Sequence, residues 1–285
     1  MSTPLITFLS DYGYDDEFVG VCHGVIAGRC PQARVIDITH AIPACDVRTG
    51  ALVLADALAY MPAGVHLAVV DPGVGARERP EVARPIEDRP ARAAVAVSCV
   101  HAPQRLLVGP DNGVLALALE RFGGPLQAVE ISRSKERLHP LSRTFHGRDI
   151  FAPVAAALAA GAQLDDVGEP LSPAALRTLD LPRAEYRGGG LVAHVLRRDH
   201  FGNLVLDATP AELEVMTGED RSEVVLVAGA SAHSAYTAGA FADVAVGELL
   251  VYEDANGALA IAVNGGSAAE LLRVSAGAEI LVRPA

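Results

Sequence analysis

The chain has 285 residues, a formal net charge of −12 and a hydrophobic fraction of 51%. This length suits one large domain or two ordinary ones, and we expect two. The negative charge disfavours nucleic acid and anionic membranes as partners, because both require a positive protein face. No apolar run approaches the roughly 18 residues of a membrane helix, and no basic segment precedes an apolar one at the N-terminus. We therefore expect a cytoplasmic protein that binds a small molecule.

The four cysteines do not form a recognisable metal or disulfide pattern. They are Cys22, Cys30, Cys45 and Cys99. Neither the Cys-x-x-Cys spacing of a zinc site nor the density of a disulfide scaffold is present. We expect reduced thiols, mostly buried, and no metal is implied by them.

The first part of the chain alternates apolar strands with helices. Expected strands cover 5–9, 35–38, 65–70, 93–97, 105–108 and 128–131, and expected helices cover 17–28, 51–60, 114–122 and 150–161. Asp46 can cap the second helix. Such alternation is typical of βαβ units, so we predict a mostly parallel sheet flanked by helices. Residues 76–90 are rich in charge and proline, and they predict a solvated loop.

The pattern changes after about residue 171. The expected strands become short and alternating, over 191–196, 204–206, 223–227, 248–252, 259–263 and 279–283. Turn residues separate them, which favours an antiparallel β-barrel-like domain. We predict an N-terminal α/β domain over 1–186 and a C-terminal β domain over 187–285.

Asp71 is the first candidate for chemistry. The apolar run 65–70 ends abruptly in Asp71-Pro72-Gly73, which is how a buried strand brings a carboxylate to the rim of a sheet. Ligands bind at such carboxyl ends of strands in open α/β sheets. The alternative is an acid that only opens the turn before Pro72.

Other polar clusters follow expected strands or turns. They are Asp11 with Asp15 and Asp16, Asp111 with Asn112, 146–149 and 199–203. Each one is weak by itself. Asn112-Gly113 and 199–203 also fit ordinary turns, and a single histidine such as His146 is more often structural than catalytic. The common nucleotide, serine-hydrolase and zinc-protease motifs are absent.

Taken together, the clusters resemble one family. Six motifs occur in the family's order: Ser10-Asp11-Tyr12-Gly13, Asp71-Pro72-Gly73-Val74-Gly75, Gly109-Pro110-Asp111-Asn112-Gly113, Thr144-Phe145-His146-Gly147-Arg148-Asp149, Asp199-His200-Phe201-Gly202-Asn203, and Ile261 to Asn264 with Ser267 to Glu270. This arrangement resembles the S-adenosyl-L-methionine (SAM) hydroxide adenosyltransferases, relatives of the fluorinase and chlorinase. The resemblance extends over essentially the whole chain.

The resemblance implies hydrolysis of SAM at C5′ to adenosine and L-methionine, without a metal or other cofactor. It also implies an α/β domain followed by a β-barrel-like domain. Family members are typically homotrimers whose active sites lie between subunits. We therefore expect SAM as the small-molecule partner and a homotrimer as the assembly.

The resemblance also assigns roles to residues. The catalytic aspartate falls on Asp71 and the catalytic histidine on His146. The ribose-binding aspartate falls on Asp11, the acid that contacts the methionine amino group on Asp199, and the amide that reads adenine on Asn203.

The chain departs from the family pattern at two positions. The catalytic arginine is expected seven residues after Asp71, where this chain has Glu78 between Arg77 and Arg79. We predict Arg79, with Arg77 and Arg92 as alternatives. A serine expected near the substrate carboxylate is replaced by Ala255, which leaves backbone N–H groups over 255–257 as the expected donors.

Two other functions remain open from the sequence. One is halide attack on the same carbon, giving a 5′-halo-5′-deoxyadenosine. The other is a non-catalytic protein that binds SAM or a nucleoside. A carboxylate at Asp71 repels a halide ion, by roughly 4 kcal/mol at 4 Å and an effective dielectric constant of about 20, which favours hydrolysis.

Overall fold

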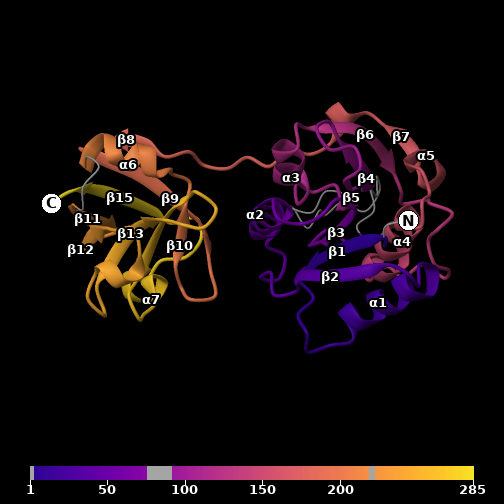
Figure 1. Ribbon diagram of the computed structural model, residues 1–285, viewed down its shortest axis with the longest axis horizontal. Helices are drawn as coiled ribbons and strands as arrows, with labels where there is room; N and C mark the ends of the chain where they lie inside the picture. The colour runs from indigo at the N-terminus through magenta and orange to yellow at the C-terminus, as the bar shows by residue number, and fades with distance from the viewer. Residues whose placement is uncertain (1–2, 76–91, 218–221) are drawn as a thin grey trace, which may run out of the picture. The chain divides into compact units, whose positions relative to one another are not determined.

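The computed structural model describes residues 3–75, 92–217 and 222–285. The chain divides into two compact units, Met1–Leu179 and Asp180–Ala285. Each unit has its own sheet and hydrophobic core (Figure 1). Among the described helices, none combines the length and the apolar content that a membrane span requires.

The N-terminal unit is built on a seven-stranded sheet with the order β2-β1-β3-β5-β4-β6-β7. Its strands are β1 (Leu5–Ser10), β2 (Arg34–Thr39), β3 (Val65–Val69), β4 (Ala94–Cys99), β5 (Leu106–Pro110), β6 (Pro125–Glu130) and β7 (Glu169–Leu171). In the described part, β2, β1, β3 and β5 are parallel neighbours, whereas β4 and β7 run against their neighbours. The predicted mostly parallel sheet is confirmed.

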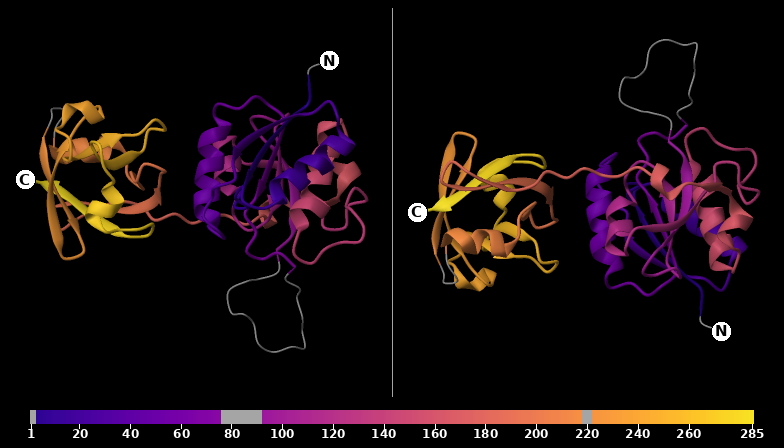
Figure 2. Two further views of the ribbon diagram at one scale, coloured as in Figure 1. Left: turned by 90° about the horizontal axis from the view of Figure 1, so that it is seen from below. Right: turned by 90° about the horizontal axis from the view of Figure 1, so that it is seen from above.

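Helices cover both faces of this sheet (Figure 2). The helices of this unit are α1 (Phe18–Arg29), α2 (Val47–Leu58), α3 (Ala116–Arg121), the π-helix η1 (Gly147–Phe151), α4 (Ala152–Ala159), α5 (Leu164–Val167) and the 3₁₀ helix η2 (Pro173–Ala175). Residues of α1, η1, α4 and α5 share one core with the sheet, and residues of α2 and α3 share the other. Asp46 caps α2 as predicted, because its Oδ1 accepts a hydrogen bond of 2.9 Å from the Thr49 N–H.

Strand β3 shows how a core strand ends in a polar group. Its side chains are buried along its whole length and alternate between the two cores: Leu67 faces the α1 and α4 side, and Ala68 faces the α2 and α3 side. After Val70 the chain leaves the sheet at Asp71. The Asn112 amide donates a 2.8 Å hydrogen bond to the carbonyl of Val70, which ties this end of β3 to the turn after β5.

The C-terminal unit is a closed barrel. Its strands are β8 (Glu185–Arg187), β9 (Gly190–Arg198), β10 (Leu204–Leu206), β11 (Glu223–Ala228), β12 (Ser231–Thr237), β13 (Leu249–Glu253), β14 (Leu259–Val263) and β15 (Glu279–Pro284). The described strands follow the order β10-β14-β13-β12-β11-β15-β9-β8, and β10 also pairs with β9, which closes the ring. The predicted barrel is confirmed, with one parallel pair, β12 with β13, among the described strands.

The barrel core follows the alternation of its strands. On β9, Leu191, Ala193 and Val195 point into the same core, and the helices α6 (Pro210–Thr217) and α7 (Ala268–Leu272) and the 3₁₀ helix η3 (Phe241–Asp243) connect the strands. Strand β12 and helices α6 and α7 were not expected from the sequence.

Candidate active site

Three side chains meet at one edge of the N-terminal sheet: Asp71, Arg92 and His146. Asp71 follows β3, and Arg92 stands just before β4. Strand β3 is parallel to β5, and β4 is antiparallel to β5, so the start of β4 lies at the same edge as the end of β3. His146 precedes η1, whose residues pack against the same sheet.

Arg92 is the centre of this cluster. Its Nε donates a 2.9 Å hydrogen bond to Asp71 Oδ1, and its Nη2 donates to Asp71 Oδ2. The same Nη2 lies 3.1 Å from Nδ1 of His146. Only 5% of the Arg92 side chain and 6% of the Asp71 side chain are exposed. The guanidinium also lies over the ring of Phe151, at 5.2 Å from its centre, so packing fixes its plane.

The contact with Arg92 determines the protonation of His146. Because a guanidinium only donates, Nδ1 of His146 must accept, and the neutral ring then carries its proton on Nε2. Burial lowers the pKa of His146, and the positive charge of Arg92 lowers it further. The carboxylates of Asp71 and Asp149 and a backbone hydrogen bond with Ser142 raise the pKa by less, so it stays below its usual value and His146 is a neutral ring.

Asp11 and Tyr12 belong to the loop that follows β1. The Asp11 carboxylate accepts a 2.8 Å hydrogen bond from the Cys45 N–H. Burial raises the pKa of Asp11, and the nearby charge of Asp71 raises it further. Burial likewise raises the pKa of Tyr12 well above its usual value. A side-chain carbon at Gly147 would overlap the phenol oxygen of Tyr12, so a larger residue there would require Tyr12 to move.

The predicted Arg79 and its alternative Arg77 fall in 76–91, outside the described residues. Arg92, the other alternative, is described and contacts both Asp71 and His146. The sequence held a usable signal for Arg92, because it stands directly before the expected strand 93–97. A strand that begins at the edge where β3 ends brings the residue before it to Asp71.

Asn112, for which a turn and a ligand role were both considered, is engaged within the fold. Its amide nitrogen bonds the Val70 carbonyl, and its Oδ1 accepts from the Val114 N–H at 3.1 Å. These two bonds favour the turn role, and they support the backbone next to Asp71.

In the C-terminal unit, Asp199 and Asn203 form a closed loop between β9 and β10. Asp199 Oδ1 accepts from the Asn203 N–H and Oδ2 from the Asn203 side chain, both at 2.8 Å. Gly202 has a φ of +87°, and a side chain there would collide with Ser267. Asn203 is 5% exposed, whereas Phe201 beside it is 75% exposed. The loop is thus rigid at its base and presents an aromatic ring at its tip.

The turn around Ala255 is shaped by Asp254. Asp254 Oδ1 accepts from the Asn256 N–H at 2.8 Å, and its carbonyl accepts from the Gly257 N–H at 3.1 Å. Two of the three N–H groups that we expected to bind the substrate carboxylate are therefore used within the turn.

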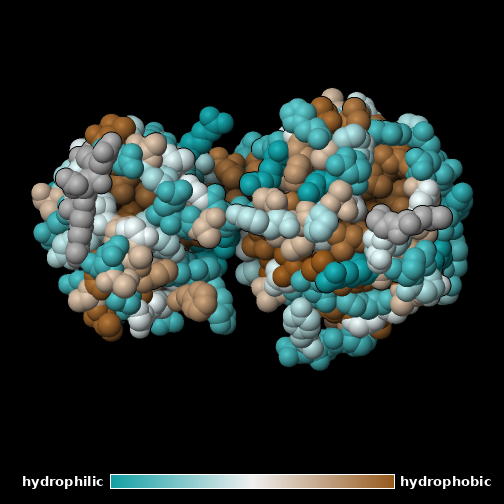
Figure 3. All heavy atoms as spheres, in the orientation of Figure 1, coloured by the Kyte–Doolittle hydropathy of each residue, from teal (hydrophilic) through white to brown (hydrophobic). Residues whose placement is uncertain are grey.

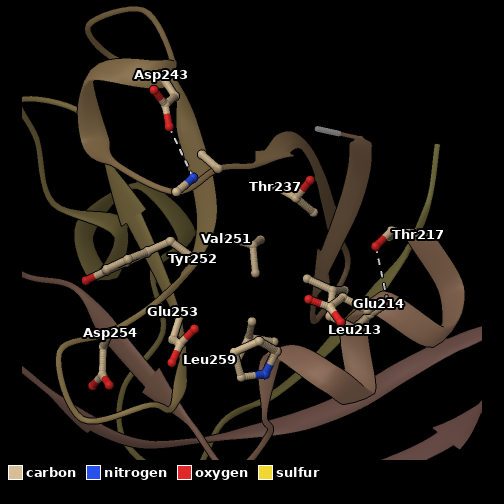
Figure 4. Close-up of a pocket in the computed structure, with 13 residues that line it drawn as sticks. Leu213, Glu214, Thr217, Thr237, Asp243, Val251, Tyr252, Glu253, Asp254 and Leu259 are labelled. Atoms are coloured by element: carbon tan, nitrogen blue, oxygen red, sulfur yellow. Dashed lines mark hydrogen bonds between the residues drawn. The ribbon is translucent and has the colours of Figure 1, made fainter. Parts of the chain in front are cut away.

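A cavity of about 630 Å³ lies in the barrel unit, between α6 and strands β12 to β14. Leu213, Thr237, Tyr252 and Leu259 are among its lining residues (Figure 4). Its lining includes neither Asp199 nor Asn203, so the cavity is separate from the polar loop described above.

Comparison with known proteins assigns the chain to a family. The model of the SAM hydroxide adenosyltransferase N-terminal domain matches residues 6–168, and that of the C-terminal domain matches 193–281. The chain belongs to the SAM hydroxide adenosyltransferase family. The resemblance stated from the sequence motifs is thereby confirmed.

Members of the SAM hydroxide adenosyltransferase family and its relatives resemble the chain to different degrees. It is 47% identical over 280 residues to the (R)-S-adenosyl-L-methionine hydrolase of Salinispora tropica, covering 98% of each protein. It is 29% identical over 294 residues to a fluorinase of an Actinoplanes species, covering 99% of this chain and 98% of the fluorinase. A solved structure of an uncharacterized conserved protein from Thermotoga maritima superposes with a TM-score of 0.84 at 35% identity, over 98% of this chain and 99% of that one.

Proposed function

We propose that the protein hydrolyses SAM at C5′ and releases adenosine and L-methionine. The buried cluster of Asp71, Arg92 and His146 is the observation that carries this proposal. The greater similarity to a SAM hydrolase, 47% against 29% for a fluorinase, supports water rather than halide as the nucleophile.

The cluster suits the activation of a water molecule. Asp71 accepts a proton from water, and the Nε2–H of His146 donates a hydrogen bond to the water oxygen. Arg92 stabilises the hydroxide character that develops on this oxygen and holds the other two side chains in place. We propose Arg92, rather than Arg79, as the arginine of the catalytic set.

The displacement needs neither a general acid nor a metal. The water oxygen forms a bond to C5′ while the C5′–S bond breaks, and the bonding electron pair goes to sulfur. The leaving group is then the neutral thioether of methionine, and Asp71 takes the proton that water loses. We therefore propose that the reaction uses no cofactor.

Pairing with Arg92 changes the argument against a halide. The ion pair offsets the charge of Asp71, so simple repulsion of an anion is smaller than for an isolated carboxylate. Hydrogen bonding still discriminates, because each Asp71 oxygen bonded to Arg92 keeps a second lone pair that can accept from water. Water supplies both a donor and an acceptor, whereas a halide only accepts and leaves Asp71 facing an anion.

Three further residues are proposed to hold the substrate. Asp11 binds the ribose hydroxyls and Asp199 the methionine amino group. The side-chain nitrogen of Asn203 is directed at Asp199, so we assign its amide oxygen to the adenine amino group.

We also propose a cytoplasmic homotrimer with active sites between subunits. Exposed apolar side chains support an interface: Phe201 is 75% and Val246 is 82% exposed. Hydrophobic residues also reach the visible surface of both units among hydrophilic ones (Figure 3).

The test is product analysis. Purified protein is incubated with SAM in ¹⁸O-labelled water, with and without chloride. The products are separated by chromatography and their masses are measured by mass spectrometry. Hydrolysis at C5′ predicts adenosine that carries the heavy oxygen, with unlabelled methionine. Formation of 5′-chloro-5′-deoxyadenosine would assign the protein to the halogenases, and unchanged SAM would make it a binding protein.

A further inference from the structure

A second polar cluster lies at the end of β2, outside the proposed catalytic set. It consists of His23 on α1, Asp37 on β2 and His40 just after β2. Nε2 of His23 lies 2.9 Å from Asp37 Oδ1, and Nε2 of His40 lies 3.1 Å from the same oxygen. The three ligand-type atoms all lie within 4.8 Å of one another.

His40 is buried but its Nε2 is not satisfied. The side chain is 0% exposed, and within the described part of the chain Nε2 makes no hydrogen bond. Asp37 Oδ1 lies 3.1 Å away but does not meet the criteria for a hydrogen-bond partner of Nε2. A buried ring nitrogen without a partner costs free energy, so its position beside a carboxylate and a second imidazole calls for a ligand.

The other nitrogen of His40 has a hydrogen-bond partner, as the second nitrogen of a metal-binding histidine usually does. Nδ1 lies 2.6 Å from Ser10 Oγ, which fixes the ring. When Nδ1–H donates to this oxygen, Nε2 presents a lone pair towards Asp37 and His23. Metal-ligating imidazoles are oriented by such an outer hydrogen bond from the second nitrogen.

We propose that His23, Asp37 and His40 form a binding site for a divalent transition-metal ion, with zinc as the preferred probe. Two imidazoles and one carboxylate are ligands that zinc accepts, and the fourth position of a tetrahedron is open to water. Ligand atoms around zinc stand about 3.3 Å apart when each bond is about 2.0 Å. The separations of 2.9 and 3.1 Å are close to this value.

Exposure allows an ion to enter this site. The His23 side chain is 36% exposed and that of Asp37 is 29% exposed. The ion would reach His40 from the solvent side while Phe8 closes the inner side, its ring centre 4.5 Å from that of His40.

The ion would join α1 to β2 and support a loop of the proposed active site. The His40 carbonyl accepts a 2.7 Å hydrogen bond from the Gly13 N–H, and Ser10 Oγ accepts one from the Tyr12 N–H at 3.3 Å. The segment between these contacts carries Asp11. The site is therefore structural, and the ion takes no part in the chemical step proposed above.

The experiment uses the full chain without an affinity tag, stripped with EDTA and titrated with zinc chloride against a competing chromophoric chelator. We expect one ion per chain and an increase in the thermal midpoint. His23→Gln should weaken zinc binding at least about tenfold. This side chain is partly exposed, so the variant should fold, with an unchanged midpoint in EDTA. His101→Gln, at an exposed histidine of the same unit, is the matched control and should bind as wild type.

Cobalt loading identifies the ligands. Co²⁺ in this site should show visible bands of a four-coordinate ion without a sulfur charge-transfer band, which excludes Cys45 and the other thiols. X-ray absorption of the zinc-loaded wild type should show two imidazoles. No zinc binding, equal binding by wild type and His23→Gln, or sulfur in the coordination shell would each overturn the proposal.

Discussion

The guanidinium of Arg92 holds the carboxylate of Asp71 through both Nε and Nη2, in a pair whose side chains are 5% and 6% exposed. Such a two-point contact fixes both the position and the plane of the carboxylate. Removing one partner of a buried pair leaves an uncompensated charge and costs about 3–5 kcal/mol. A test of the role of Arg92 therefore has to keep its charge.

Arg92→Lys keeps the charge but cannot reach Asp71 and His146 together. We expect kcat to fall at least about 100-fold with KM changed little. The ammonium group is a compact charge and lacks the planar array of N–H donors with which a guanidinium contacts two partners at once. Arg77→Lys and Arg79→Lys are the matched controls and should stay within about twofold of wild type. Steady-state kinetics on the three variants decides between the arginines, and a large drop in Arg79→Lys alone would reject Arg92.

Asp71→Asn removes the proton acceptor and nearly preserves shape. Because it also leaves Arg92 without its charged partner, thermal unfolding must first show that the variant is folded at the assay temperature. We expect turnover to fall by about 10²–10⁴, the range of general base catalysis, while adenosine binding stays within about threefold in calorimetry. The exposed Asp180→Asn serves as control. Parallel loss of turnover and of adenosine binding would mean that Asp71 has only a structural role.

Gly147→Ala tests how closely Tyr12 packs against η1. The added methyl group would overlap the Tyr12 hydroxyl, and overpacking of this kind costs about 1–3 kcal/mol. Gly20→Ala in α1 has open space around it and should instead stabilise the protein by about 0.5–1 kcal/mol. Urea unfolding of both variants provides the comparison.

Tyr12→Phe should restore part of the stability that Gly147→Ala loses, because it removes the oxygen that the methyl group meets. A double-mutant cycle measures this coupling. Additive effects of the two changes would show that Gly147 is constrained by something other than Tyr12.

The hydrophobic pattern predicted most of the fold, because each unit buries its strands in a regular alternation. The continuous apolar run 65–70 identified β3 and Asp71 as its end. Strand β12 was missed since its sequence, Ser-Ala-His-Ser-Ala-Tyr-Thr, has little apolar alternation, and its pairing with β11 and β13 decides its conformation.

Helices α6 and α7 each begin with a capping pattern that can be read in the sequence. Thr209 and Glu212 form reciprocal hydrogen bonds at the start of α6, and Ser267 accepts from the Glu270 N–H at the start of α7. Both fit the Ser/Thr-x-x-Glu capping pattern. Both helices are short, so no apolar period accompanies the cap.

The arginine beside Asp71 was harder to predict for a different reason. Its family spacing is counted along the chain, whereas its position beside Asp71 is set by strand order. A longer connection between β3 and β4 need not move the start of β4, because the entropic cost of closing a loop grows slowly with its length. Spatial adjacency of strand ends, rather than distance along the sequence, brings Arg92 to Asp71.

His66 on β3 predicts a measurable pH dependence of stability. Arg105 Nη1 lies 3.2 Å from its Nε2, which must accept, so its Nδ1–H donates to Thr7 Oγ1 at 2.9 Å. Burial first, and then the charge of Arg105, lowers the pKa of His66 to about 3. The native ring thus stays neutral where the unfolded chain, with a histidine pKa near 6.5, binds a proton.

Stability should therefore fall as the pH drops from about 6.5 towards 3, by up to about 1.4 kcal/mol per pH unit from this group. His66→Gln does not titrate, so its free energy of unfolding should depend less steeply on pH in that window. The exposed His101→Gln should keep the wild-type slope. Identical slopes in His66→Gln and wild type would contradict a neutral buried His66.

The proposal that active sites lie between subunits predicts complementation between inactive variants. Asp71→Asn damages only the N-terminal part of the site, and Asn203→Ala damages only the C-terminal part. In co-assembled trimers, some interfaces pair the intact N-terminal unit of one chain with the intact C-terminal unit of its neighbour. When equal amounts of the two variants assemble at random, about a quarter of all interfaces combine two intact units.

Co-expression of the two variants should thus restore about a quarter of wild-type turnover per chain, whereas mixing the separately assembled proteins should restore less until subunits exchange. Light scattering on the same samples measures the mass of the assembly. Co-expressing Asp71→Asn with Arg92→Lys is the matched control, because both changes lie in the N-terminal unit and no interface regains an intact site. The contrary result is that co-assembled trimers of Asp71→Asn and Asn203→Ala give only the sum of the two residual activities. Each active site would then be contained within one chain, because pairing units from two different chains would not have produced an intact site.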